Sequence, residues 1–294
     1  MKILINRKPV QGPWGGGNLF VRAFCDALGG KGHTVVHELS DDIDVIFMQD
    51  PRYSDLGISI DEVIQYKKHR PETKVIHRVN ECDARKGTQG VDSLLQECSR
   101  HTDKTIFVSD WMKRYHLDRG WQCNDTAVVY NGVNLNHFKL RDKISNGKVN
   151  IVTHHWSNNR MKGFDVYEAI DKFIKNRNFT FTYIGRDLGT FKNTSVLSPL
   201  CGVALGEQLS KYDVYISGSL YDPGPNHILE SIACGLPTYA IQNGGGASEF
   251  VGNDHTYSDI HELFKILETG NFSKNKLYVG SWKSCIEKYE KEIL

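Results

Sequence analysis

The sequence has no surplus of charge of either sign. Lys and Arg together number 36 against 35 Asp and Glu, which gives a formal net charge of +1. No overall field therefore draws nucleic acid or anionic lipid to the whole molecule, although local basic patches such as Lys113-Arg114 remain open. We expect no nucleic-acid partner.

Long apolar runs and paired cysteines are also missing. No stretch approaches the ~18 apolar residues of a membrane span, and the strand pattern at 3–5 is too brief for a signal-peptide core. The seven cysteines form no Cys-x-x-Cys pair, and their odd number indicates free thiols in a reducing compartment. We therefore expect a cytoplasmic protein, or one held peripherally at the inner face of a membrane.

What the chain does have is the length for two modest domains and a repeated alternation of strand and helix patterns. Such alternation predicts α/β domains with doubly wound parallel sheets. Strand patterns lie at 3–6, 34–37, 45–48, 74–78, 104–108, 126–130, 149–153, 179–184 and 214–217. Helical patterns lie between them, at 19–28, 60–68, 91–100, 110–116, 166–174 and 206–211.

Two carboxylates follow the last of these strands. Asp222 and Glu230 lie eight positions apart, on either side of a turn and at the start of an apolar helical pattern. Pro225 suits the first helical position, and a helix that starts after a strand offers N–H groups to a phosphate. Carboxylates would repel that phosphate, so they are better used to accept hydrogen bonds from hydroxyl pairs on either side of it. A nucleotide-sugar offers both a ribose diol and a sugar ring.

This stretch resembles the acidic-x7-acidic signature of glycosyltransferase family 4 (glycosyl transferases group 1), retaining enzymes of the GT-B fold. The family usually has Glu where this chain has Asp222, whose side chain reaches less far. The resemblance implies that Glu230 holds the ribose hydroxyls and faces a ligand instead of a protein salt bridge. It implies that Asp222 contacts the transferred sugar together with Pro223, Gly224, Pro225 and Asn226, and that the Gly-Gly-x-x-Glu turn is formed by Gly245, Gly246 and Glu249. Taken singly, Asp222 is equally typical of a turn and Glu230 of an exposed helix face.

A second motif lies where a predicted loop meets a helix. Lys162-Gly163 is similar to the end of the family's Arg-x4-Lys-Gly motif, with Ser157 in place of the Arg. The resemblance implies that Lys162 neutralises the diphosphate leaving group and that Gly163 lies beside the donor. Arg160 is the nearby substitute for the missing cation, and Gly185, after the next strand pattern, is a further predicted donor contact.

The first half contributes a glycine-rich loop and a polar run. Gly16 and Gly17 precede a helix, as in the family's opening, and by resemblance would lie beside the donor phosphate and the acceptor. A dinucleotide fingerprint fits poorly because Phe20 stands at the third glycine position. Asn80 and Glu81 follow a strand and are candidates for acceptor or sugar contact, with a solvated loop as an equal alternative.

Two patterns that suggest a metal are better explained otherwise. Asp42-Ile43-Asp44 leads into a strand instead of following one, which favours a turn. His154 and His155 are neighbours on a strand, so their side chains point to opposite faces. We expect no metal and no cofactor beyond the substrate, a nucleotide-diphosphate sugar with UDP or GDP.

The chain is expected to divide near Asn131-Gly132-Val133-Asn134, with Phe138 beyond, which is similar to the family's Asn-Gly-Val-Asp-x-x-x-Phe hinge. We expect an acceptor-side domain at 1–138 and a nucleotide-sugar-binding domain at 139–278. The amphipathic segment 279–294 is expected to form a helix that crosses back to the first domain. The resemblance thus implies the GT-B fold, two Rossmann-like domains that face each other across a cleft.

The function implied is a metal-independent retaining hexosyltransferase of class EC 2.4, active in glycan biosynthesis. It would move a sugar from the nucleotide-diphosphate donor to a glycan, lipid-linked or small-molecule acceptor. Two alternatives stay open: a nucleotide-sugar epimerase of the same fold, and a non-catalytic protein that binds nucleotide-sugars or glycans. The epimerase would consume donor without an acceptor, and the binding protein would bind donor without turnover.

Overall fold

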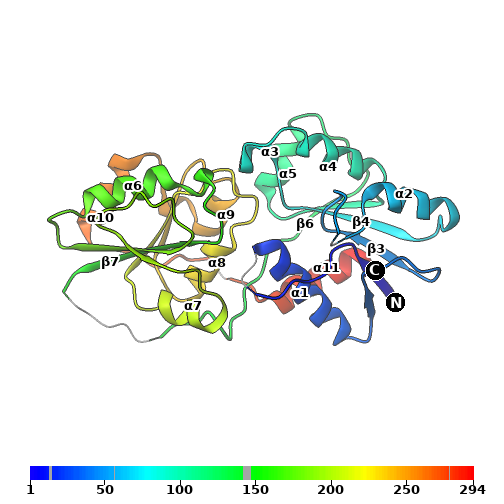
Figure 1. Cartoon of the computed structure of the whole chain (residues 1–294), viewed down its shortest axis with the longest axis horizontal. Coiled ribbons are helices and arrows are strands. Elements are labelled where there is room, and N and C mark those ends of the chain that lie inside the picture. Colours follow the sequence, from blue (N-terminus) through cyan, green and yellow to red (C-terminus); the bar gives the residue numbers. More distant parts are fainter. Residues whose placement is uncertain (13–14, 56, 142–146, 278) are drawn as a thin grey trace. The chain divides into compact units, whose positions relative to one another are not determined.

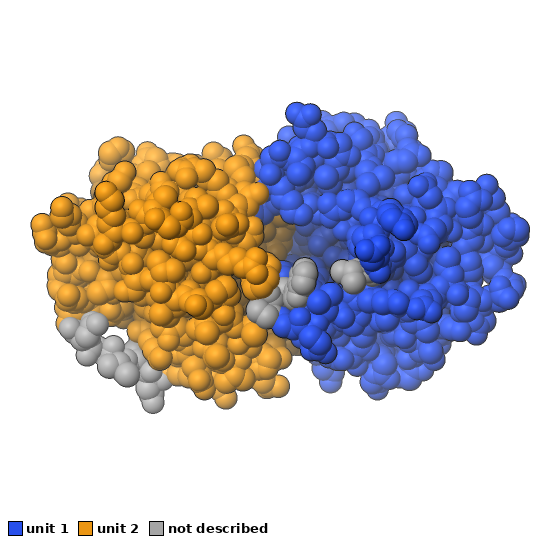
Figure 2. Space-filling view, in the orientation of Figure 1, with its two compact units in different colours: residues 1–131, 282–294 blue, residues 132–281 orange. Residues whose placement is uncertain are grey.

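The computed structural model describes residues 1–12, 15–55, 57–141, 147–277 and 279–294. The chain forms two compact units, residues 1–131 with 282–294 and residues 132–281 (Figure 2). The first boundary lies before Phe138, and the final segment belongs to the first unit. All seven cysteines are free thiols, as the sequence predicts. Within the described residues, no helix combines the length and the apolarity needed to cross a membrane.

The first unit has a parallel sheet of six strands in the order β2-β1-β3-β4-β5-β6. Helices α1 and α11 cover one face, and α2, α4 and α5 cover the other, with α3 as one short turn (Figure 1). The strands are β1 (Lys2–Ile5), β2 (Thr34–Val36), β3 (Val45–Met48), β4 (Lys74–Val79), β5 (Lys104–Phe107) and β6 (Thr126–Val128). The helices are α1 (Gly16–Gly29), α2 (Ile60–His69), α3 (Asp83–Lys86), α4 (Val91–Arg100), α5 (Asp110–Leu117) and α11 (Trp282–Ile293).

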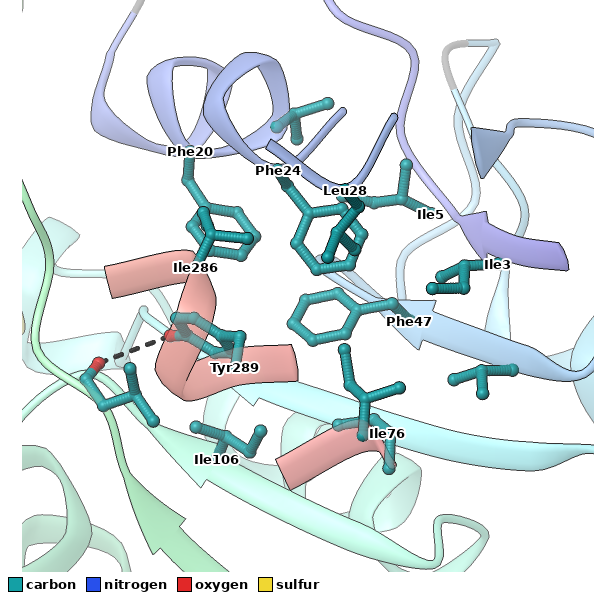
Figure 3. Packing of buried hydrophobic residues seen from close by; sticks show 14 of the residues in the cluster. Ile3, Ile5, Phe20, Phe24, Leu28, Phe47, Ile76, Ile106, Ile286 and Tyr289 are labelled. Carbon is teal, nitrogen blue, oxygen red and sulfur yellow. Dashed lines mark hydrogen bonds between the residues drawn. The ribbon is translucent and has the colours of Figure 1, made fainter. Parts of the chain in front are cut away.

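The last helix completes the core of the first unit. Its Ile286 and Tyr289 pack among Phe20 and Phe24 of α1 and Phe47 of β3 (Figure 3). The ring centroids of Phe20 and Tyr289 lie 5.0 Å apart, and those of Phe24 and Phe47 lie 4.6 Å apart. Such aromatic pairs add to the free energy gained by burying apolar area. The apolar side chains of the amphipathic segment at the end of the chain therefore pack into the core of the first unit.

The second unit repeats the plan, with strands in the order β12-β11-β10-β7-β8-β9, all parallel. Helices α6 and α10 pack on one face through Phe164, Tyr167, Leu263 and Leu267 (Figure 1). The strands are β7 (Val149–His155), β8 (Phe179–Gly185), β9 (Ser195–Leu197), β10 (Val214–Ser217), β11 (Thr238–Ile241) and β12 (Thr256–Tyr257). The helices are η1 (Arg160–Lys162), α6 (Phe164–Phe173), α7 (Gly202–Leu209), α8 (Asn226–Ala233), α9 (Ala247–Val251), η2 (Asn253–His255) and α10 (Ile260–Thr269).

The two parallel sheets with flanking helices confirm the predicted α/β class with Rossmann-like units. Each sheet has one point where the direction of winding reverses. In the first sheet, β1 is followed by β2 on one side and β3 on the other; in the second, β7 is followed by β8 on one side and, later, β10 on the other. Ligands of open α/β sheets bind at the carboxyl ends of the strands beside such a reversal. These two edges are therefore where a site is expected.

Candidate functional site

Three loops meet at the reversal point of the second sheet. They follow β7, β10 and β11, and backbone hydrogen bonds join them. The N–H of Leu220 donates to the carbonyl oxygen of Met161 over 2.9 Å, and the N–H of Asp222 donates to that of Gly244 over 3.0 Å. The carbonyl oxygen of Asp222 in turn accepts from the N–H of Gly246 at 2.8 Å. The predicted motifs around Lys162, Asp222 and Gly245 therefore form one structure.

Two glycines make this close approach feasible. Gly163 has a φ of +99°, and a Cβ there would lie 2.3 Å from the carbonyl carbon of Gly218. Gly245 has a φ of +77°, and a Cβ there would lie 2.5 Å from the backbone nitrogen of Asp222. Any other residue would both strain the backbone and push the loops apart. The glycines of both motifs are thus needed to bring their polar neighbours together.

Lys162 and Asp222 are the first pair that these loops align. The Lys162 Nζ lies 3.3 Å from the Asp222 Oδ2, which also accepts a hydrogen bond from the Ser219 hydroxyl at 3.2 Å. The lysine side chain is 21% exposed and the aspartate side chain 9%. Tyr221, directly before the aspartate, has a φ of +49°, a conformation that costs energy in a residue other than glycine. A partly accessible cation and a carboxylate therefore lie next to the start of α8.

Glu230 lies on α8 and contacts a residue that the sequence analysis set aside. Its Oε2 lies 2.8 Å from the Nε2 of His154, near the end of β7. The other ring nitrogen, Nδ1, is buried and has no hydrogen-bond partner among the described residues, so we place the proton on Nε2 and treat His154 as the donor. Sequence reasoning considered His154 only as a metal ligand and missed this contact.

The expectation that Glu230 faces a ligand instead of a protein salt bridge needs correction in one respect. The residue is only 9% exposed, and one of its two carboxylate oxygens is occupied by His154. Among the described residues no hydrogen bond reaches the other oxygen, Oε1, and 12% of the side chain remains accessible. Only Oε1 is thus available to a ligand, while the hydrogen bond to Oε2 fixes the direction of the carboxylate.

Further polar side chains are buried beneath this pair. The Nε2 of His155 lies 2.6 Å from the Tyr167 hydroxyl, and the Ser217 Oγ lies 2.9 Å from the Nε2 of His227. The rings of His155 and His227 lie 4.8 Å apart. Burial also raises the pKa of Tyr215 well above its usual value, so this phenol stays protonated. The strand ends of β7 and β10 therefore form a fixed, hydrogen-bonded floor.

Several other residues that the sequence predicted to contact the donor instead contact other groups of the protein. Arg160 forms ion pairs with Asp165 and with Glu168, the latter at 3.2 Å, so two carboxylates already neutralise its charge. Gly185 ends β8 with a φ of +144°, and a Cβ there would lie 1.9 Å from the His155 carbonyl oxygen, so close packing explains this glycine.

Two further predicted residues lie at helix starts. Pro225 is the N-cap of α8 and not its first residue, and Glu249 lies in the first turn of α9.

The first unit holds the remaining predicted residues. A Cβ on Gly17, in the first turn of α1 after Gly16, would lie 3.7 Å from the Asn80 Nδ2, so the glycine loop and the polar run do meet. Glu81 instead forms ion pairs, with Arg52 at 2.8 Å and with Lys86. Asn80 is therefore the better placed of the two for a ligand.

No family model and no curated protein matches this sequence. Solved structures match over nearly the whole chain. Sucrose-phosphate synthase from Thermosynechococcus elongatus is 14% identical and superposes with a TM-score of 0.73, over 99% of this chain and 97% of its own. HepE from Anabaena in complex with UDP and glucose is 12% identical, with a TM-score of 0.73 over 99% and 98%. WaaG, a glycosyltransferase of lipopolysaccharide biosynthesis, is 14% identical, with a TM-score of 0.63 over 99% and 95%.

The fold is GT-B. Both Rossmann-like units have counterparts in these neighbours, since the matches cover almost all of each chain. At this level of identity the likeness establishes architecture, and the chemistry has to be argued from the residues of this chain.

Proposed function

We propose that this GT-B protein transfers a sugar from a nucleotide-diphosphate donor held at the carboxyl edge of its second sheet. The observation that carries the proposal is the contact of Lys162 with Asp222 over 3.3 Å, beside the start of α8. A cation and a helix N-terminus together suit a diphosphate, and the adjacent carboxylate suits sugar hydroxyls. The neighbouring HepE structures, which contain UDP and UDP-glucose, favour UDP over GDP as the carrier.

Charge explains how these groups would promote transfer. Breaking the bond between sugar and phosphate leaves an oxocarbenium-like sugar and an additional negative charge on the diphosphate. Lys162 and the backbone N–H groups at the start of α8 would stabilise that charge as it develops. Asp222 holds the lysine side chain over the site at 3.3 Å until the donor arrives. Lys162 would then exchange its carboxylate partner for the phosphates, which frees Asp222 for the transferred sugar.

Glu230 would select the ribose. Its Oε1 can accept from a ribose hydroxyl while His154 keeps Oε2 in place, so the carboxylate is already oriented before binding. We extend the proposal to a metal-independent retaining hexosyltransferase of the family 4 type, in which the leaving phosphate itself receives the acceptor's proton. The second unit would bind the donor, and the first would bind a glycan, lipid-linked or small-molecule acceptor.

Thermal unfolding with UDP-, GDP- and ADP-sugars tests the donor, because a specific ligand raises the apparent stability by mass action. We expect one nucleotide-sugar to raise Tm, and its sugar to be consumed only when an acceptor is present. Stabilisation without turnover across an acceptor panel would make the chain a binding protein. Conversion of the sugar without any acceptor would make it an epimerase. The absence of stabilisation by any nucleotide-sugar would refute the proposal.

A further inference from the structure

The loop after β7 does not by itself carry enough positive charge for a diphosphate. Its two cations, Arg160 and Lys162, already contact three carboxylates between them. A diphosphate would add further negative charge at this edge, and an anion binds tightly only where charged donors face it. Another segment therefore has to contribute a cation if the donor lies here.

The neighbouring strand carries such a cation at its end. β7 and β8 pair in parallel up to their last residues, His155 opposite Gly185, so Trp156 and Arg186 leave the sheet side by side. The guanidinium carbon of Arg186 lies over the Trp156 ring, 4.0 Å from its centroid. Among the described residues, no carboxylate forms an ion pair with Arg186. The stack therefore places an uncompensated positive charge at the carboxyl edge of the second sheet.

Hydrogen bonds hold the loop that carries Arg186. The Tyr183 hydroxyl donates to the Arg186 carbonyl oxygen at 3.1 Å. At the far end of the loop, the Asp171 carboxylate accepts from the backbone N–H groups of residues 192–194 at 2.8 to 3.1 Å. Although burial favours its protonated form, hydrogen bonds from Thr194 and the backbone lower the pKa of Asp171, so this anchor stays charged. A loop fixed at both ends loses little freedom when a ligand binds.

The other charged residues of this loop do not take the same position. Lys192 lies shortly before Ser195, which pairs with the middle of β8, so the chain has already turned back from the carboxyl edge. Asp187 forms a local turn, in which its Oδ2 accepts from the N–H of Gly189 at 2.9 Å. Arg186 is therefore the residue of this loop that can offer charge at the edge.

We propose that Arg186 is a second cation for the diphosphate of the donor, beside Lys162, and that Trp156 is the positioning residue that holds its guanidinium. The inference rests on the proposed function and adds two residues to the same site. An aromatic face attracts a guanidinium and leaves the N–H groups at its rim to donate to phosphate oxygens. Arg186 thus replaces Arg160, which would have to leave two carboxylates before it bound a phosphate.

Arg186→Gln tests the cation, because it removes the charge and keeps most of the length of the side chain. We expect the Kd for UDP to rise at least tenfold, since hydrogen bonds from a charged donor are lost. The Kd for uridine should stay the same, because uridine carries no phosphate. Calorimetric titration measures both. An equal rise in the two Kd values would mean that Arg186 contacts the nucleoside, and would overturn the proposal.

Trp156 is tested in two backgrounds. Trp156→Phe keeps an aromatic face and should retain the affinity for UDP, whereas Trp156→Leu should raise the Kd severalfold. In the Arg186→Gln background, Trp156→Leu should have no further effect, because the ring acts through the arginine. A tryptophan with only a structural role would weaken UDP binding equally in both backgrounds, which would refute its assignment as a positioning residue.

Arg177→Gln is the matched control. Arg177 also lies over an aromatic ring of the second unit, 4.3 Å from the centroid of Phe173, but it pairs with Glu268. This variant should leave the Kd for UDP unchanged. A rise in the Kd for Arg160→Gln without a rise for Arg186→Gln would return the role to Arg160.

The same titrations separate this inference from the proposed function. If Lys162→Ala weakens UDP binding and Arg186→Gln does not, the donor site stands and this inference alone is wrong. If the unmodified chain binds no UDP, the proposed function is wrong and this inference fails with it.

Discussion

Replacing Glu230 with Gln tests the donor site most directly. The substitution keeps the shape of the side chain and leaves an amide oxygen that can still accept from His154 at the 2.8 Å separation of the pair. The structure leaves only Oε1 for a ligand, so one charge-assisted hydrogen bond to ribose would become a neutral one. That change is worth about 1.4 kcal/mol, the difference between typical charged and neutral hydrogen bonds. A tenfold increase in the Kd for UDP follows, since about 1.4 kcal/mol is a factor of ten.

Calorimetric titration with UDP and 2′-deoxy-UDP measures the effect. If Glu230 accepts a hydrogen bond from a ribose hydroxyl, the unmodified chain should bind UDP more tightly than 2′-deoxy-UDP. The ratio of the two Kd values should then be smaller in Glu230→Gln. Glu268→Gln is the matched control, because Glu268 is also a helical glutamate of the second unit but pairs with Arg177 at the surface. It should change neither Kd. An unchanged Kd and an unchanged ribose preference in Glu230→Gln would show that the carboxylate only pairs with His154.

Three further predictions concern the rest of the molecule. Lys162→Ala should lower the initial rate of sugar transfer by about 10²-fold or more, the usual effect of removing one electrostatic group. Gly163→Ala should lower the free energy of unfolding by about 3 kcal/mol and abolish UDP binding, because its Cβ would meet Gly218. Burial lowers the pKa of His77 to about 3 and that of His116 to about 4, so both are neutral when folded but protonate when unfolded below pH 6.5. The free energy of unfolding should therefore decrease as the pH falls from 6.5 towards 4, by about 1.4 kcal/mol per pH unit for each of the two histidines.

Each of these has a clear contrary result. Unchanged transfer rates in a folded Lys162→Ala variant would remove the lysine from the mechanism. A Gly163→Ala variant that unfolds at the same urea concentration as the unmodified chain would mean that the two loops are not held together as described. For the histidines, urea unfolding at pH 7 and pH 5 should differ, and His116→Phe, which can still stack on Trp121, should reduce the difference. A flat profile would contradict the burial argument.

Local patterns were enough to predict the strands of the first sheet and three strands of the second, β7, β8 and β10. Strands that are covered on both faces need nearly continuous apolar runs, such as Val45–Met48, and these stand out in the sequence. The same patterns failed after residue 235, where β11, β12, α9 and α10 follow one another in short segments. Such short elements owe their form to pairing and packing with distant neighbours, for example Tyr215 opposite Thr238, which no local pattern records.

Within the site, the sequence revealed what is local and missed what is distant. Asp222 and the glycines beside it belong to one segment, so their spacing alone indicated a loop that precedes a helix. His154 and Glu230 are 76 positions apart, and only folding shows that they pair. The strand pattern at 74–78 contains Arg78, but nothing local indicated that β4 continues to Val79 or that distant neighbours leave this arginine only 1% exposed.

The two reversal points differ in how their cations are compensated. Lys162 already has Asp222 as a partner, so an anion that binds there must first replace a contact of 3.3 Å, and part of its binding energy is lost in the exchange. Among the described residues, Arg78 of the first unit instead donates to neutral oxygens of Tyr289, Gln49 and Asn131, so hydrogen bonds and not an ion pair stabilise its charge. The lysine is 21% exposed and the arginine only 1%, so salt will screen an anion bound at Lys162 but will leave the buried hydrogen bonds of Arg78 in place. Donor binding should therefore weaken as ionic strength rises, while the first unit keeps its stability.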